Sequence, residues 1–267
     1  MNRILVIAYN TVLEALRDRI LYSLVLFSVL MIIGSIIITT ISAEQYIKIV
    51  KDVGLMTISV IGILISVFLG MNVVYKEIEK KTVYNIFSKP VRRYEFIIGK
   101  FLGISSTLFL ITICMSIILS VIVYYYQAKY AAFIEFHYGG IYYSQFIWAI
   151  LFTFLEFLIL IALSLVFSSF STPVMTVLFV FLTFVIGRFS SDIRLFTEVV
   201  KDPMAGKIAG MLYRIIPHLD IYNLRSQAVY GGVISNSLIL NTILYTIVYC
   251  SALLLLSIIV FEKKEFK

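Results

Sequence analysis

Four runs of about 20 apolar residues, each without a charged side chain, constrain this chain more than any other feature. They are Leu21–Ile41, Val53–Tyr75, Ile104–Tyr126 and Asn241–Phe261. An α-helix of this length crosses the roughly 30 Å hydrocarbon core of a bilayer. Apolar residues make up 61% of the chain and charged residues 14%, so a water-soluble fold could not bury the apolar surface. The sequence therefore predicts an all-α membrane protein.

A fifth apolar run, Phe146–Gly187, is too long for one crossing. As a single helix its 42 residues would be about twice as long as the bilayer is thick. The sequence SSFSTP, Ser168–Pro173, is the expected hinge, because proline suits the first turn of a helix and the hydroxyls can cap it. The spans are then Phe146–Ser168 and Pro173–Gly187, which makes six in a single transmembrane domain of residues 1–267.

Basic residues are concentrated in three of the polar segments that flank the spans. Residues 1–20, 76–100 and 262–267 together carry 13 Lys and Arg, whereas the short loops 42–52 and 127–145 carry three. The loop 188–240 carries six more, but it is long enough that the charge rule weakens. Short loops rich in Lys and Arg stay on the cytoplasmic side. Both termini and the 76–100 segment are therefore predicted to be cytoplasmic.

Residues 1–19 contain apolar side chains at helical spacing, namely Ile4, Leu5, Ala8, Val12 and Leu16. Asn10 and Glu14 interrupt the run, and no small-residue cleavage site follows, so the segment differs from a signal peptide. The pattern predicts an amphipathic helix in the inner membrane interface. The alternative is a cytoplasmic extension of the first span.

The segment Lys76–Lys100 holds ten charged residues, seven of them basic, and must protrude from the membrane. Tyr75–Lys81 is expected to continue the second span as a charged helix. A short helix should follow, capped by Thr82, with one apolar face, and ended by Pro90. That face consists of Val83, Ile86 and Phe87. Such a projection fits the groove of a second protein; the alternative is a basic loop that only fixes topology.

The run EIEKKTVYNIFSKPVRRYEFIIGKFLG, Glu77–Gly103, closely resembles a signature of ATP-binding-cassette permeases of the type-2 (ABC-2) exporter class. In that family an acidic residue after the second span is followed by Thr, an "LLSKP" segment, a basic pair and "GK" entering the third span. The departures are mild, because Lys81 precedes Thr82 where Gly is usual, and Ile86 and Phe87 replace the leucines. The outer segment Arg214–Gly232 is similar to nitrous-oxide-reductase maturation permeases.

The resemblance implies that this segment is a coupling helix held in a cleft of a separate ATPase subunit. The matching residues are Glu77 or Glu79, Thr82, Ile86, Phe87, Ser88, Lys89, Pro90, Arg92, Arg93, Gly99 and Lys100, and Val83 of the apolar face is expected to dock with them. Arg92, Arg93 and Lys100 are also expected to return the chain to the phosphate-rich interface. The family further implies two ATPase copies, a second permease copy or paralogue, and export across a prokaryotic cytoplasmic (inner) membrane.

The sequence contains no motif for catalysis. Gly99–Lys100 lacks the rest of a phosphate-binding loop, so ATP and Mg²⁺ are expected on the partner ATPase and no cofactor on this chain. The only histidines, His137 and His218, lie in outer loops without metal-ligand spacing, and a metal site is not expected. Basic residues flank apolar runs, which favours lipid over nucleic acid as their partner.

Glu156 is the one charge forced toward mid-membrane, where it costs about 2.5–3.5 kcal/mol on insertion scales. It is expected to contact substrate or a proton, to bond across a dimer interface, or to be protonated beside a Ser or Thr. The outer loop 188–240 is expected to form short helices over Ile208–Ile216 and Ile221–Val233 before the last span. Its polar candidates are Arg214, Pro217, Asp220 and Arg225.

Two other function classes remain open from the residues alone. The first is a membrane scaffold or sensor that recruits a cytoplasmic partner through the 76–100 loop without transport. The second is an ion-coupled carrier, which would be expected to have several intramembrane charges, whereas only Glu156 is available.

Overall fold

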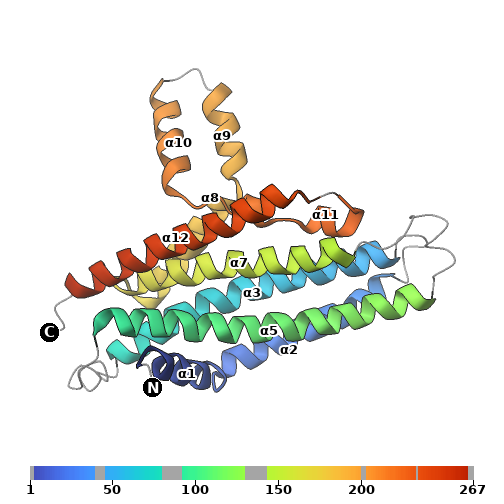
Figure 1. Cartoon of the computed structure of the whole chain (residues 1–267), viewed down its shortest axis with the longest axis horizontal. Coiled ribbons are helices and arrows are strands. Elements are labelled where there is room, and N and C mark those ends of the chain that lie inside the picture. Colours follow the sequence, from blue (N-terminus) through green and yellow to red (C-terminus); the bar gives the residue numbers. More distant parts are fainter. Residues whose placement is uncertain are drawn as a thin grey trace.

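The computed structural model describes residues 3–39, 46–79, 92–129, 143–199, 203–232 and 234–263. Every regular element in these ranges is a helix. Figure 1 shows long helices running side by side as a bundle. They are α2 (Arg19–Thr39), α3 (Tyr46–Glu79), α5 (Arg93–Lys129), α7 (Tyr143–Ser168) and α12 (Asn236–Lys263).

Shorter helices lie at the edges of this bundle. The helix α1 (Arg3–Ala15) precedes α2, and α8 (Pro173–Arg188) follows α7. The helices α9 (Ser190–Val199) and α10 (Pro203–Ile215) pack side by side and project away from the bundle (Figure 1). A 3₁₀ turn, η1 (Asp220–Tyr222), and α11 (Arg225–Tyr230) lead back to α12. The predicted short helices of the outer loop are thus present, but α9 was not predicted.

Five helices in the described ranges, α2, α3, α5, α7 and α12, are long and apolar enough to cross a membrane. The apolar helix α8, with 16 residues, is shorter than these five. The helices also extend past the predicted spans. Residues 46–52, predicted to be outer loop, form the first two turns of α3, where Val50 and Lys51 are buried against the bundle. Packing therefore continues the helix through a polar stretch.

The predicted hinge between α7 and α8 is confirmed, since α7 ends at Ser168 and Pro173 begins α8. The predicted hydroxyl cap is wrong, because Thr172 makes no side-chain hydrogen bond to the helix start. The Ser169 hydroxyl instead donates to the Leu165 carbonyl at 2.7 Å and lies 3.2 Å from the Ser257 hydroxyl. In this way the hinge is tied to α12.

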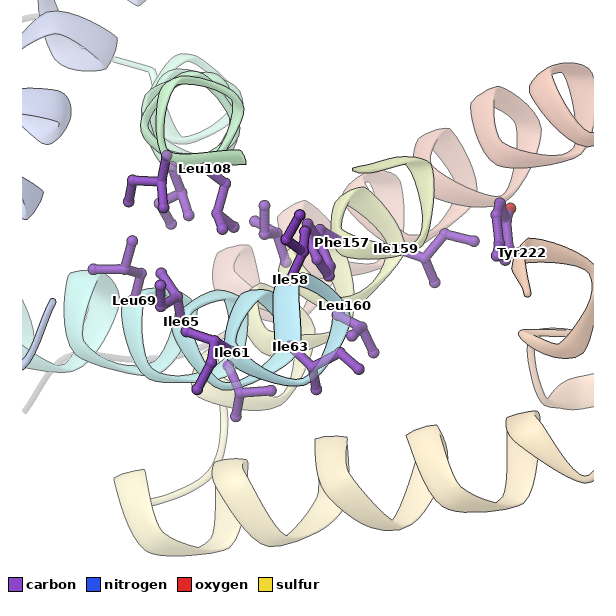
Figure 2. Close-up of a cluster of buried hydrophobic side chains, with 14 of the residues drawn as sticks. Ile58, Ile61, Ile63, Ile65, Leu69, Leu108, Phe157, Ile159, Leu160 and Tyr222 are labelled. Carbon is purple, nitrogen blue, oxygen red and sulfur yellow. The ribbon is translucent and has the colours of Figure 1, made fainter. Parts of the chain in front are cut away.

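The helices α3, α5 and α7 meet in the buried centre of the bundle. Figure 2 shows Ile58, Ile65 and Leu69 of α3 close to Leu108 of α5 and Phe157 of α7, and all five side chains are buried. These residues recur at helical spacing on α3, so one face of that helix is committed to the core. By contrast, α2 and α12 have many exposed apolar side chains.

The helix α1 is separate from α2 and packs along the first turns of α5. A continuous extension of the first span is therefore wrong. Gly99 and Gly103 of α5 allow the close approach to α1. A methyl group added at Gly103 would lie 2.7 Å from the Ala8 carbonyl oxygen. Lys100 lies beside them, with its ammonium 3.4 Å from the Glu14 carboxylate. Its side chain is buried, so Lys100 is held within the protein, and the expected return of the chain to the phosphate-rich interface stays a prediction.

We expect Gly103→Ala to lower the free energy of unfolding by about 1–3 kcal/mol, because the new methyl group must push α1 away from α5. Gly34→Ala in α2 is the matched control, since nothing lies within 4 Å of the added methyl group. The control should be neutral or stabilising by up to about 1 kcal/mol through helix propensity. Thermal unfolding in detergent measures both, and equal effects would contradict the close contact of α1 with α5.

Candidate functional site

A pocket of about 270 Å³ lies between α3, α7, α8 and the η1–α11 segment. One wall is largely apolar and comes from α3, whereas polar groups come from the other elements. The lining residues are Leu55, Met56, Ser59, Val60, Ile63, Ala149, Thr153, Glu156, Phe184, Arg188, Tyr222, Asn223, Leu224 and Arg225. A few convergent polar groups in a mostly apolar pocket are typical of a ligand site.

The buried carboxylate of Glu156 is paired with Arg188 in this pocket. The Arg188 guanidinium nitrogen lies 3.3 Å from Glu156 Oε1, and the side chains are 25% and 1% exposed respectively. The same guanidinium group donates to the Leu219 carbonyl at 2.9 Å and lies 5.7 Å from the Phe184 ring centre. A buried charge needs such a partner, because desolvation without one is costly.

Arg188 reaches Glu156 because it is the last residue of α8, where the helix dipole favours a cation. Glu156 Oε1 has no hydrogen-bond partner among the described residues, and the expected bond of a protonated Glu156 to a Ser or Thr stays a prediction. Its expected contacts with a substrate, a proton or a second subunit stay predictions.

A second ion pair lies at the edge of the pocket. Arg225 Nε is 2.8 Å from Asp52 Oδ1, and the side chains are 42% and 46% exposed. The pair joins α11 to the start of α3. Because both groups are well solvated, its contribution to stability is on the order of 0–1 kcal/mol.

A polar cluster lies outside the pocket, where α9 meets η1. The Asp220 carboxylate accepts hydrogen bonds from the hydroxyls of Ser190 and Ser191. The His218 ring stacks on Tyr213, with ring centres 4.2 Å apart. Burial lowers the pKa of His218, and the nearby Asp220 carboxylate partly opposes this shift.

The four outer-loop candidates therefore do not form one site. Arg225 lines the pocket, and Asp220 belongs to the polar cluster. Pro217 is buried, and Arg214 is exposed at the end of α10. The described residues contain no group of three or more His, Cys, Asp and Glu side chains that could hold a metal ion, and His137 lies outside them.

The expected ATPase-coupling residues are only partly described. Glu77 and Glu79 belong to the last turns of α3, whereas Thr82, Val83, Ile86, Phe87, Ser88, Lys89 and Pro90 lie outside the described residues. Arg92 precedes α5, and its backbone N–H donates to Glu95. Arg93 donates to the carbonyls of Phe261 and Glu262 at 2.7 and 2.8 Å. Arg93 is therefore engaged by the end of α12.

Sequence reasoning missed Arg188, Asp52 and Tyr222. The sequence did indicate Arg188 as a partner for Glu156, because Arg188 is the first charged residue after the Pro173–Gly187 run and an ionised, buried Glu156 needs a cation. Asp52 and Tyr222 had none, since their roles depend on how the outer segment folds back.

A family model described as an ABC-2 family transporter protein matches residues 5–266. The chain belongs to the ABC-2 transporter family. The resemblance inferred from Glu77–Gly103 is thereby confirmed, and with it the assignment as a multi-pass membrane permease of the ABC transporter class. No curated protein matches the chain. The narrower likeness to nitrous-oxide-reductase maturation permeases stays a prediction.

We expect Arg188→Met to lower the free energy of unfolding of the permease by about 3 kcal/mol, because it leaves the Glu156 carboxylate buried without its cation. Glu156→Gln should cost less, since Arg188 is partly exposed and keeps its bond to Leu219. A double-mutant cycle on thermal unfolding measures the coupling between the two side chains.

Asp52→Asn is the control for this cycle, because it breaks an exposed pair at the same pocket. Its cost should stay below about 1 kcal/mol. If Arg188→Met costs no more than Asp52→Asn, the buried pair does not stabilise the fold.

Proposed function

We propose that this chain is the permease subunit of an ABC exporter and moves a substrate across a prokaryotic cytoplasmic membrane when a separate ATPase subunit hydrolyses ATP. Membership of the ABC-2 family over residues 5–266 carries this proposal. ATP and Mg²⁺ would bind to the partner chain. Two ATPase copies and a second copy of the permease, or a paralogue, would complete the exporter.

The position of the 76–100 segment supports its role as the ATPase docking site. Its described ends are the last turns of α3 and the start of α5. Arg93 contacts the end of α12, and Gly99 contacts Ile7 of α1, so these elements share one end of the bundle (Figure 1). A basic segment connecting two spans at this end is accessible to one cytoplasmic partner.

The course of the chain supports six crossings, with α8 as the fifth. The end of α7 lies near the inner half of α12, because the Ser169 and Ser257 hydroxyls are 3.2 Å apart. Since α12 ends beside Arg93, it must begin at the opposite end of the bundle. The residues between α7 and α12 therefore cross once, and the apolar α8, which ends opposite the middle of α7 where Arg188 meets Glu156, supplies the first part of this crossing.

The pocket around Glu156 and Arg188 is the proposed part of the substrate path within one subunit. It lies beside exposed apolar side chains of α3 and α8, including Met56, Val60 and Phe181. A second permease copy placed against this face would enclose the pocket between two subunits. Both polar and apolar groups would then face the substrate.

We expect Phe87→Asp to abolish co-purification of the ATPase subunit, because it places a carboxylate on the apolar docking face. A loss of affinity of at least about tenfold is expected. Phe87→Leu should retain binding, since it restores the residue that the family uses. Affinity purification from membranes measures both, and retention of the ATPase by Phe87→Asp would contradict the docking proposal and favour a scaffold or sensor with another binding surface.

Orientation is tested with single cysteines in a Cys114→Ser background. A membrane-impermeant maleimide should label Ser88→Cys only after permeabilisation, because the segment is proposed to be cytoplasmic. Ser235→Cys, which is exposed just before α12, should be labelled in intact cells. The reverse pattern would show that the chain is inserted the other way.

A further inference from the structure

We propose that α12 transmits movement of the ATPase-facing end of the permease to the pocket in the opposite half of the bundle. The inference rests on the proposed ATPase docking at residues 76–100. It assigns a positioning role to Arg93 and Thr246, which hold the two ends of this transmission. Neither residue lines the pocket.

The inner contact joins α5 to the C-terminal end of α12. Arg93 donates to the carbonyls of Phe261 and Glu262 at 2.7 and 2.8 Å. The last carbonyls of a helix lack intrahelical partners and carry partial negative charge, so bonds from a guanidinium group there are strong. The rings of Phe96 and Phe261 stack with centres 5.7 Å apart, and both are buried. The start of α5 cannot move without displacing α12.

The outer contact joins α12 to η1. The hydroxyls of Tyr222 and Thr246 lie 2.6 Å apart and are buried. One residue along α12, the Tyr245 hydroxyl accepts a hydrogen bond from the His218 backbone N–H at 3.0 Å. Tyr222 lines the pocket, and Leu219, beside η1, accepts the hydrogen bond from Arg188. The outer contact therefore positions both a pocket wall and the partner of Glu156.

The two contacts lie on one continuous helix. Thr246 and Phe261 are separated by 15 residues, or about 22 Å along the axis. Much of α12 faces outward, with Leu244, Ile247 and Leu255 all exposed. Few of its side chains are buried, but Ser257 is bonded to Ser169 and to the Leu165 carbonyl at the end of α7, so the hinge must move together with α12 in a rigid-body shift.

The pocket has a second wall that is connected to the docking segment by a different route. The helix α3 runs from that segment to the apolar wall without interruption. A displacement of the start of α5 relative to the end of α3 would therefore move η1 relative to α3. Such a relative movement would change the width of the pocket around Glu156 and Arg188.

The test uses the permease in complex with the ATPase subunit that co-purifies with it. Asn223→Cys in a Cys114→Ser background is the reporter, because Asn223 lines the pocket and is exposed. The rate of maleimide labelling is compared without nucleotide and with ATP plus orthovanadate. We expect the two rates to differ at least about fivefold, the lower range of typical coupling between sites.

Thr246→Val removes the hydrogen bond to Tyr222, which is the part of the outer contact that holds the pocket wall, and Arg93→Met removes the inner hydrogen bonds. Each should reduce the nucleotide-dependent difference to less than about twofold, in complexes that still contain the ATPase. Ser251→Ala is the matched control on α12, because its hydroxyl bonds only the Ile247 carbonyl of its own helix among the described contacts. The control should keep the full difference. If Arg93→Met does not assemble with the ATPase, Phe261→Ala tests the same inner contact.

The proposal is overturned if Thr246→Val and the inner-contact variant keep the full nucleotide-dependent difference in labelling rate. It is also overturned if the labelling rate of Asn223→Cys, without any further substitution, does not depend on nucleotide in a complex that hydrolyses ATP. Failure of the unmodified chain to co-purify with any ATPase is a different result. It overturns the proposed function itself and removes the basis for a transmission helix.

Discussion

The cost of leaving a charge in a low-dielectric interior governs the half of this permease that contains the pocket. Glu156 lies in the middle of α7 and is almost fully buried, so an ionised carboxylate there needs a cation within reach. Arg188 does so from the end of α8, and its second bond, to Leu219, fixes the chain that leads into η1. One ion pair thus sets the end of a helix, the position of the outer segment and the polar side of the pocket.

Most buried hydroxyls avoid the same cost without contacting another helix. Thr11, Ser66 and Ser164 each donate to the carbonyl four residues earlier in their own helix. Hydrogen bonds between helices are consequently few among the described residues, and the pairs Ser169–Ser257 and Tyr222–Thr246 stand at opposite halves of α12. Because apolar contacts tolerate sliding and hydrogen bonds do not, these polar points determine how the helices are placed relative to one another.

The long helices were predictable because an uncharged run of about 20 apolar residues has few other stable forms. Their limits were not, since the polar start of α3 is held in place by packing against residues distant in the sequence. The hinge at Pro173 followed from local backbone chemistry, whereas the partner of Glu156 depended on the path of the chain beyond it. Family membership could be predicted from Glu77–Gly103, because that segment carries a linear motif that is recognised without any tertiary contact.

The length of α8 has a consequence for the lipid around the permease. Its 16 residues extend about 24 Å, less than the roughly 30 Å of an average hydrocarbon core. Val174 and Leu178 on this helix are exposed, so in the proposed six-span topology the acyl chains that touch them would tilt or thin the leaflet locally. Under that proposed topology, membranes of short-chain phospholipids would match this side of the protein with the least elastic deformation, and membrane thickness would be a physical variable for the permease.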